Sequence, residues 1–186
     1  MKSGIFVVAE LRGEVRERVA EIQRWADPKL ASGSAPHITL VGSSGVGPMP
    51  GRTPIARIRE LLEPIVSETP PIRVHFGPPM RFMQTDIIVL PIDPHGPLRT
   101  LHERIATSGL TFEQARFSFS PHCTLTFFPT LTPATQRRLL SVRVPDPVVI
   151  DRLQFYLTLD PQPARKVLEL ELRGKGEAGS GARSGS

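Results

Sequence analysis

The chain has 186 residues, enough for one domain but too few for two of ordinary size. Its single cysteine excludes a fold stapled by disulfides, and no stretch approaches the roughly 18 apolar residues of a membrane span, so we expect a cytoplasmic protein that does not enter membranes. The formal net charge of +5 favours anionic partners such as nucleotides or RNA, although a basic surface also serves solubility alone.

Strand-like and helix-like patterns alternate along the first half of the chain. An apolar run rich in β-formers comes first, and Val15, Val19 and Ile22 then recur at the spacing of one helix face. Proline and glycine clusters separate the later segments. The predicted elements of this half are a strand at 4–11, a helix at 13–26, a loop at 32–34, a strand at 36–41, a helix from Pro54 that ends or kinks near Pro64, and a strand at 72–76.

The second half repeats this order of elements. They are a strand at 86–92, a helix at 98–108, a strand at 117–128, a helix at 132–141 capped by Thr132, and strands at 148–159 and 166–172. Residues 174–186 are mostly glycine, serine and alanine, which is typical of a disordered tail. We therefore predict a single domain at 1–173, built from two repeats at about 4–83 and about 85–173.

One pentapeptide occurs in both halves. Pro-His-Ile-Thr-Leu at 36–40 recurs as Pro-His-Cys-Thr-Leu at 121–125. Successive side chains of a strand point to opposite faces, so His37 and Thr39 share one face, as do His122 and Thr124. The alternate positions are apolar and anchor each strand to a core. If the two strands meet at one groove, they supply two imidazoles and two hydroxyls to it.

This set of side chains suits acid–base chemistry on a phosphate. A histidine with an ordinary pKa of about 6.5 serves as acid or as base near neutral pH. Two histidines on opposite sides of a phosphate can activate water and protonate the leaving oxygen, and the threonine hydroxyls can donate hydrogen bonds to the phosphate. The arrangement requires no metal. The sequence leaves open which histidine is the acid.

Two such motifs, one in each half of a duplicated chain of this length, resemble the 2H phosphoesterase superfamily, and in particular its 2'-5' RNA ligase family. The resemblance implies an α+β, two-lobed fold of mainly antiparallel sheets around a central groove with flanking helices. It implies hydrolysis of 2',3'-cyclic phosphate ends of RNA or nucleotides, with 2'-5' RNA ligation as the reverse reaction. His37 and His122 match the catalytic positions, and Thr39 and Thr124 match the phosphate-binding positions. No cofactor is implied, and we expect a monomer.

Three interpretations of the function remain open. The first is action on RNA or nucleotide ends, and the second is action of the same motifs on another cyclic phosphate or on a 2'-5' oligonucleotide. The third is an RNA-end-binding module without turnover. Several family members carry a basic residue shortly after the second motif, where this chain has Phe127, Phe128 and Pro129. The candidates for a cation that holds the substrate are Arg81, Arg116, Arg165 and Lys166.

We expect structural roles for the remaining histidines and for the cysteine. Next to His122, Cys123 points to the other side of its strand and is expected to be a small core residue, not a nucleophile. Phe127 and Tyr156 are candidate groove aromatics. The other residues expected to serve structure or packing are His75, His95, His102, Met80, Met83, Phe117 and Phe119.

Overall fold

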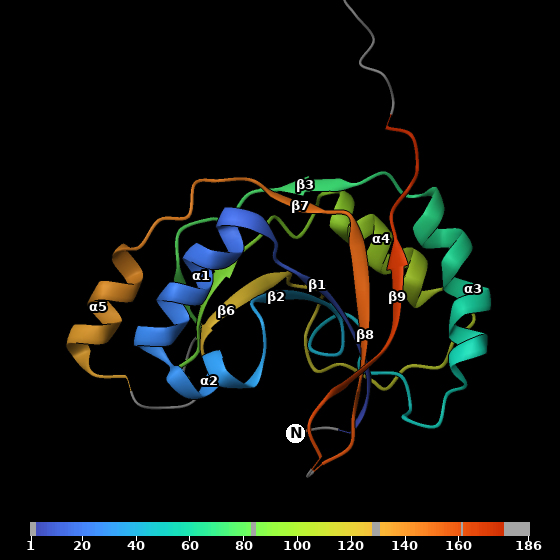
Figure 1. The fold of residues 1–186 in the computed structure, drawn as a ribbon, viewed down its shortest axis with the longest axis horizontal. Helices are drawn as coiled ribbons and strands as arrows, with labels where there is room; N and C mark the ends of the chain where they lie inside the picture. Colours follow the sequence, from blue (N-terminus) through green and yellow to red (C-terminus); the bar gives the residue numbers. More distant parts are fainter. Residues whose placement is uncertain (1–2, 83–84, 128–130, 161, 177–186) are drawn as a thin grey trace, which may run out of the picture.

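The two motif strands are neighbours in the middle of a seven-stranded antiparallel sheet (Figure 1). The computed structural model describes residues 3–82, 85–127, 131–160 and 162–176. The order of strands in this sheet is β4-β5-β6-β2-β1-β8-β9, and β3 and β7 form a separate pair. The strands are β1 (Gly4–Glu10), β2 (His37–Val41), β3 (Ile72–Val74), β4 (Met80–Arg81), β5 (Ile88–Pro91), β6 (His122–Thr126), β7 (Val148–Ile150), β8 (Arg152–Thr158) and β9 (Arg165–Glu171).

Helices from both repeats flank the sheet, as the sequence predicts. They are α1 (Gly13–Ala26), α2 (Pro28–Gly33), α3 (Ile55–Glu68), α4 (Pro97–Ala106) and α5 (Pro133–Ser141). The mixed, mainly antiparallel α+β class is confirmed. In the described part of the chain, no helix has the length and apolar character needed to cross a membrane.

Four local predictions need correction. Part of the expected loop at 32–34 belongs to α2, which Asp27 initiates by accepting a hydrogen bond from the Leu30 N–H at 2.9 Å. Helix α3 continues through Pro64 to Glu68, so of the two predicted alternatives at Pro64 the helix end is wrong. The expected strand at 148–159 is divided at Asp151 into β7 and β8, which belong to different sheets.

The fourth correction concerns the second motif strand, which is shorter than the predicted range 117–128 and begins at His122.

The strand pairing beside the two motif strands preserves the duplication in its register. In the first repeat the pairing with β2 shifts between Val7 and Val8, and in the second repeat the pairing with β6 shifts between Ile88 and Val89. Both irregularities lie beside the motif threonine, so the two halves share a backbone design as well as a motif.

The helices of the two repeats exchange places over the motif strands. Helix α1 follows β1 in sequence but packs on β6 and α5, whereas α4 follows β5 but packs on β2 and α3 (Figure 1). Buried polar side chains strengthen both exchanges. The Gln23 amide of α1 donates to the Thr124 carbonyl at 2.7 Å, and Nδ1–H of His102 in α4 donates to the Leu40 carbonyl at 2.7 Å. Each motif strand is therefore anchored by the helix of the other repeat.

Candidate active site

The register of β2 and β6 brings the four motif side chains to one face of the sheet. Ile38 pairs with Cys123, and both are fully buried. In an antiparallel pair this places His37 opposite Thr124 and His122 opposite Thr39, with all four on the face away from the core. These four side chains are half-buried, and we call the side of the sheet that carries them the motif face. The two histidines are diagonal neighbours, roughly 7 Å apart at Cβ.

Both imidazoles are held in the same tautomer by the backbone just before their strands. Nδ1 of His37 lies 2.8 Å from the Ala35 carbonyl, and Nδ1 of His122 lies 2.8 Å from the Ser120 carbonyl. A carbonyl only accepts, so each Nδ1 carries the proton. Within the described residues, each Nε2 and the hydroxyls of Thr39 and Thr124 have no hydrogen-bond partner. Two ring nitrogens and two hydroxyls are thus available to a ligand.

The surroundings favour neutral imidazoles in the free protein. Burial lowers the pKa of His37, while its hydrogen bond to the Ala35 carbonyl and the charge of Glu10 oppose that change. Burial also lowers the pKa of His122, its hydrogen bond to the Ser120 carbonyl opposes the change, and the neighbouring His37 lowers it further. A dianionic or monoanionic phosphate between the rings would favour protonation of one of them.

Neighbouring strands extend the motif face in both directions. On one side, Glu10 lies directly opposite His37 in the β1–β2 register, and the Tyr156 hydroxyl of β8 donates a hydrogen bond to the Glu10 carboxylate. On the other side, the Phe82 ring meets His122 edge-on, with centroids 5.1 Å apart. The sequence does not indicate either residue, because neither lies in a motif: the strand register places Glu10, and the ring contact with His122 places Phe82.

Of the four candidate cations, the structure places one on the motif face. Lys166 pairs with Tyr156 in the β8–β9 register and forms an ion pair of 3.1 Å with Glu169. Arg81 lies on the other face, where it contacts Asp86 at 2.8 Å and Gln136 at 3.3 Å. Arg165 pairs with Leu157, whose side chain also points away from the motif face, and Arg116 lies in an exposed loop.

Arg152 also belongs to the motif face, although it was not a candidate from the sequence. It forms an ion pair with Glu169 at 3.1 Å and a second with Asp151 at 3.3 Å. Because Lys166 shares Glu169 with it, the two cations at this edge of the sheet are already partly neutralised. Alternation along β8 is the signal that would have identified Arg152, once Tyr156 was known to lie on the same face.

The aromatic and methionine predictions have mixed outcomes. Phe119 is buried as expected, but Phe117 is 70% exposed and Met80 is 45% exposed, so a packing role is wrong for both. Met80 pairs with Val89, which pairs with Thr124, and its side chain therefore lies at the edge of the motif face. Residues Met83, Phe128 and Pro129 lie outside the described residues, as does the part of the predicted tail from residue 177.

Tyr156 and Phe127, the two candidate groove aromatics, lie in different settings. Tyr156 is half-buried on the motif face, and its contact with Glu10 contributes to raising the pKa of its hydroxyl to about 12, after the larger effect of burial. Phe127 is 55% exposed, and its backbone N–H donates to Asp27 at 2.8 Å. Of the two, Tyr156 is the one that belongs to the surroundings of the motif histidines.

The remaining histidines and the cysteine lie where structural roles predict. His102 is buried and stacked on Phe119, with ring centroids 4.0 Å apart. His75 and His95 are exposed and lie outside the strands and helices. Cys123 is fully buried, and burial raises the pKa of its thiol to about 12, so it is a core residue. The described residues contain no cluster of three His, Cys, Asp or Glu side chains placed to hold a metal ion.

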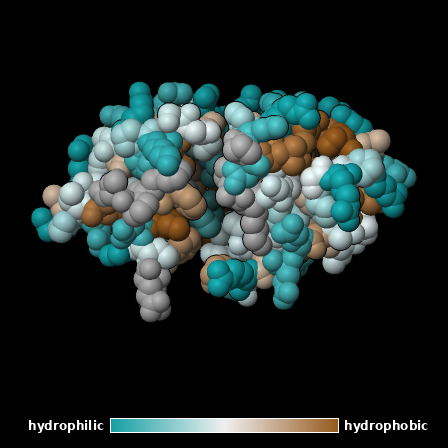
Figure 2. Space-filling view, turned by 90° about the horizontal axis from the view of Figure 1, so that it is seen from below, coloured by the Kyte–Doolittle hydropathy of each residue, from teal (hydrophilic) through white to brown (hydrophobic). Residues whose placement is uncertain are grey.

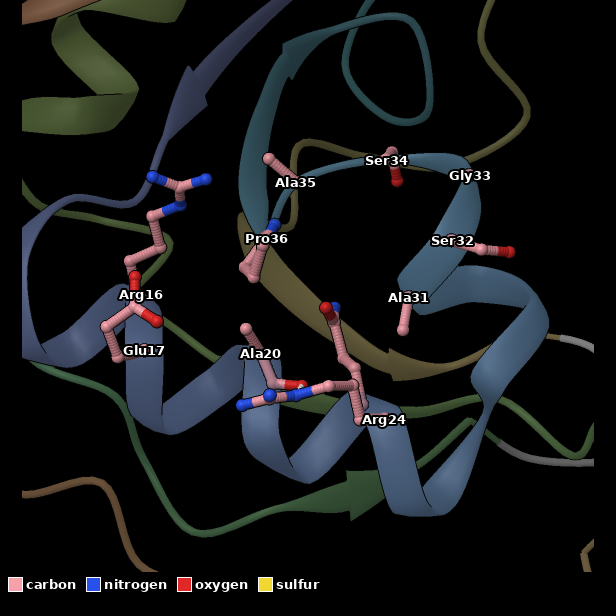
Figure 3. A pocket seen from close by; sticks show the side chains of 11 residues that line it. Arg16, Glu17, Ala20, Arg24, Ala31, Ser32, Gly33, Ser34, Ala35 and Pro36 are labelled. Atoms are coloured by element: carbon pink, nitrogen blue, oxygen red, sulfur yellow. Dashed lines mark hydrogen bonds between the residues drawn. The ribbon is translucent and has the colours of Figure 1, made fainter.

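A pocket of about 340 Å³ lies beside the motif strands. One wall comes from α1, including Arg16, Gln23 and Arg24, and the other from residues 31–36, which lead into β2 (Figure 3). None of the four motif side chains lines it. Figure 2 shows, on the face seen from below, a mainly hydrophilic surface that is hollowed between its two halves.

Known proteins share this fold and part of this sequence. A family model described as the 2'-5' RNA ligase superfamily matches residues 11–161. No curated protein sequence matches the chain. Among solved structures, LigT of E. coli complexed with phosphate has a TM-score of 0.57 at 14% identity, covering 91% of this chain and 97% of LigT.

Two further structures resemble the chain to a similar degree. LigT of E. coli complexed with 3'-AMP has a TM-score of 0.56 at 16% identity, covering 91% of this chain and 98% of LigT. The protein TT0787 of Thermus thermophilus has a TM-score of 0.63 at 16% identity, covering 92% of this chain and 99% of TT0787. At these identities the likeness establishes the fold over nearly the whole length of both chains.

Proposed function

The chain belongs to the 2'-5' RNA ligase superfamily, and on that premise we propose that it is a metal-independent phosphodiesterase that opens 2',3'-cyclic phosphate ends of RNA or nucleotides. The observation that carries the proposal is the arrangement on the motif face. His37 and His122 lie diagonally across adjacent strands with their Nδ1 atoms occupied and their Nε2 atoms available. That geometry suits two proton transfers on opposite sides of one phosphorus atom.

In the proposed reaction one imidazole removes a proton from water as the water oxygen attacks phosphorus. The other, protonated at Nε2, gives its proton to the ribose oxygen that leaves. Thr39 and Thr124 stand opposite the two histidines and donate hydrogen bonds to the non-bridging oxygens, where charge develops. The fixed Nδ1 contacts orient both rings before substrate arrives, which lowers the entropic cost of reaching the reactive geometry.

Ligation differs from hydrolysis only in the nucleophile. A 5'-hydroxyl group takes the place of water, its oxygen bonds to phosphorus, and the bond from phosphorus to the 3'-oxygen breaks, which leaves a 2'-5' linkage; each histidine keeps its role. When that linkage is cleaved back to the cyclic phosphate, the 3'-hydroxyl group is the nucleophile and the two histidines exchange the roles of acid and base. The structure of E. coli LigT complexed with 3'-AMP is that of a fold relative with a nucleotide bound, which supports a nucleotide as the ligand class for this chain. A 2'-5'-linked dinucleotide is therefore the second substrate to assay.

The direct test is turnover of a 2',3'-cyclic nucleotide in EDTA, with the phosphomonoester product separated by chromatography. We expect turnover by the wild type and a loss of at least about 100-fold in kcat for His37→Ala and for His122→Ala. His95→Ala is the matched control because His95 is an exposed histidine outside the motif strands, and it should retain wild-type kcat. Circular dichroism spectra must show that all three variants fold.

Two results would contradict the proposal. The first is no turnover of any cyclic phosphate or 2'-5'-linked substrate by the folded wild type. The second is a folded His37→Ala or His122→Ala variant that turns over substrate at the wild-type rate. Tight RNA binding in the first case would instead favour an RNA-end-binding module, whose affinity should fall with rising salt because binding to a basic surface releases counterions.

A further inference from the structure

The duplication makes the two histidines nearly equivalent, but one neighbouring position differs in charge. Glu10 of β1 is the residue opposite His37, and Pro91 of β5 is the residue opposite His122. The two positions correspond in the repeats. Glu10 lies two residues after Val8, which pairs with Thr39, and Pro91 lies two residues after Val89, which pairs with Thr124. A carboxylate therefore stands beside one imidazole, and an uncharged proline ring stands beside the other.

Contacts from β8 hold Glu10 in this position. The Tyr156 hydroxyl donates a hydrogen bond to the Glu10 carboxylate, and the backbone N–H of Glu10 donates to Oε1 of Gln154 at 3.0 Å. Directly opposite residues of antiparallel strands share a face, so the Glu10 side chain lies on the motif face with His37. The His37 Nδ1 is already bound to the Ala35 carbonyl, so Glu10 acts on this ring through its charge.

The other ionisable groups near the histidines do not reproduce this asymmetry. Further along the motif face, the charge of Glu169 is shared between Arg152 and Lys166. Helix α4, which packs on β2, presents the buried His102 from the opposite face, where burial lowers its pKa and favours the neutral ring. The charged residues beside it, Arg99 and Glu103, pair with each other at 3.2 Å.

The surroundings of His122 contain no comparable anion among the described residues. Phe82 covers its ring edge-on, Pro91 faces it from β5, and α1 approaches β6 with the uncharged Gln23. The nearby ionisable group is His37 itself, which lowers the pKa of His122. Glu10, by contrast, opposes the lowering of the pKa of His37 that burial causes. The carboxylate opposite His37 therefore favours the protonated form of that ring, and His122 has no such neighbour among the described residues.

We propose that Glu10, positioned by Tyr156, makes His37 the proton donor to the leaving ribose oxygen and leaves His122 as the base that activates water. This assignment rests on the proposed function. In the step, Nε2 of His122 takes a proton from water while the water oxygen bonds to phosphorus. The bond from phosphorus to the ribose oxygen breaks, and that oxygen takes the Nε2 proton of His37. Exchange with solvent then returns both rings to their starting states.

The informative variant is Glu10→Gln, since the amide oxygen still accepts the Tyr156 hydrogen bond while the charge is lost. The acidic limb of the pH–rate profile reports the base and the alkaline limb reports the acid. Glu10→Gln should move the alkaline limb to lower pH by roughly 1 unit and leave the acidic limb in place. Pro91→Glu, which adds a carboxylate opposite His122, should move the acidic limb to higher pH. Glu14→Gln, which removes an exposed charge from α1, should move neither limb.

Two outcomes overturn the assignment. Movement of the acidic limb in Glu10→Gln would make His37 the base, and no movement of either limb would show that Glu10 does not act on His37. If the wild type turns over no cyclic phosphate, the proposed function fails and NMR titration of the two rings decides the electrostatic claim. The ring signals are assigned by their loss in His37→Gln and His122→Gln. Glu10→Gln should lower the titration midpoint of His37 alone. Equal shifts of both midpoints, or no shift of either, would overturn the claim that Glu10 acts on His37.

Discussion

Replacing Gly45 with alanine tests how the loop after the first motif is anchored to the second repeat. Gly45 has φ +75°, and a Cβ there would stand 2.1 Å from Nε2 of His102 and 3.1 Å from Cβ of Phe119. The His102 ring cannot move aside without consequence, because it is buried, stacked on Phe119 and hydrogen-bonded to the Leu40 carbonyl. The added methyl group must therefore disturb the contact that anchors β2 to α4.

Gly109 is the matched control, because it has φ +88° but nothing within 4 Å of an added Cβ. Both variants carry the cost of a left-handed backbone in alanine, about 1–2 kcal/mol. Gly45→Ala also leaves the buried Leu40 carbonyl without its donor, about 1–3 kcal/mol, and disrupts the ring stacking, about 0.5–1.5 kcal/mol. We expect Gly45→Ala to lose about 3 kcal/mol more than Gly109→Ala, or roughly 6–12 °C in Tm for a chain of this size.

Urea and thermal unfolding of the wild type and both variants measure this difference. The comparison requires similar m-values, so that the change in midpoint reports the free energy of unfolding. A larger loss for Gly45→Ala would support the collision with His102. Equal losses for the two variants would refute the reasoning, because they would show that the backbone conformation alone sets the cost.

Three more predictions follow from buried groups. Because burial raises the pKa of Cys123 to about 12, a thiol reagent at pH 8 should label the native protein no faster than it unfolds, and rapid labelling would contradict the buried position. Gln23→Leu removes the donor to the Thr124 carbonyl and should lower the urea-unfolding free energy by about 1–2 kcal/mol; an unchanged value would show that the contact adds nothing. Burial lowers the pKa of His102, so below about pH 6.5 the unfolded chain binds a proton that the folded chain does not. On acidification the unfolding free energy of the wild type should therefore fall relative to that of His102→Gln, by at most about 1.4 kcal/mol per pH unit. Urea unfolding from pH 7.5 to 5.5 measures both free energies, and the same pH dependence in the two proteins would contradict this prediction.

Much of the fold could be predicted because local patterns and tertiary packing agree in these segments. The helix at Gly13–Ala26 has the predicted bounds, since its apolar stripe faces the core and Pro28 prevents its simple continuation. Thr132 caps α5 as expected, accepting from the Thr135 N–H at 3.1 Å. The division of 148–159 into two strands was missed, because both strands are apolar and the change of sheet at Asp151 depends on which partners pack beside them.

The candidate site, like the fold, could be predicted in part from the sequence. The amino-acid sequence determined that two His-x-Thr strands exist, that each carries its imidazole and hydroxyl on one face, and that the chain resembles a family of phosphoesterases. These conclusions need only the two-residue period of a strand and a repeated motif. The sequence alone could not show that Arg81 points away from the motif face or that Phe82 covers His122.

Only the tertiary structure decided how the two motifs meet and what surrounds them. The pairing of Ile38 with Cys123 makes the motif strands adjacent, and the pairing of Glu10 with His37 gives one imidazole a charged neighbour. Register between strands far apart in sequence depends on the packing of all the elements together, and a shift of one residue would turn each side chain to the other face. The sequence therefore specifies the reactive groups, and the register of the sheet sets the difference between the two histidines.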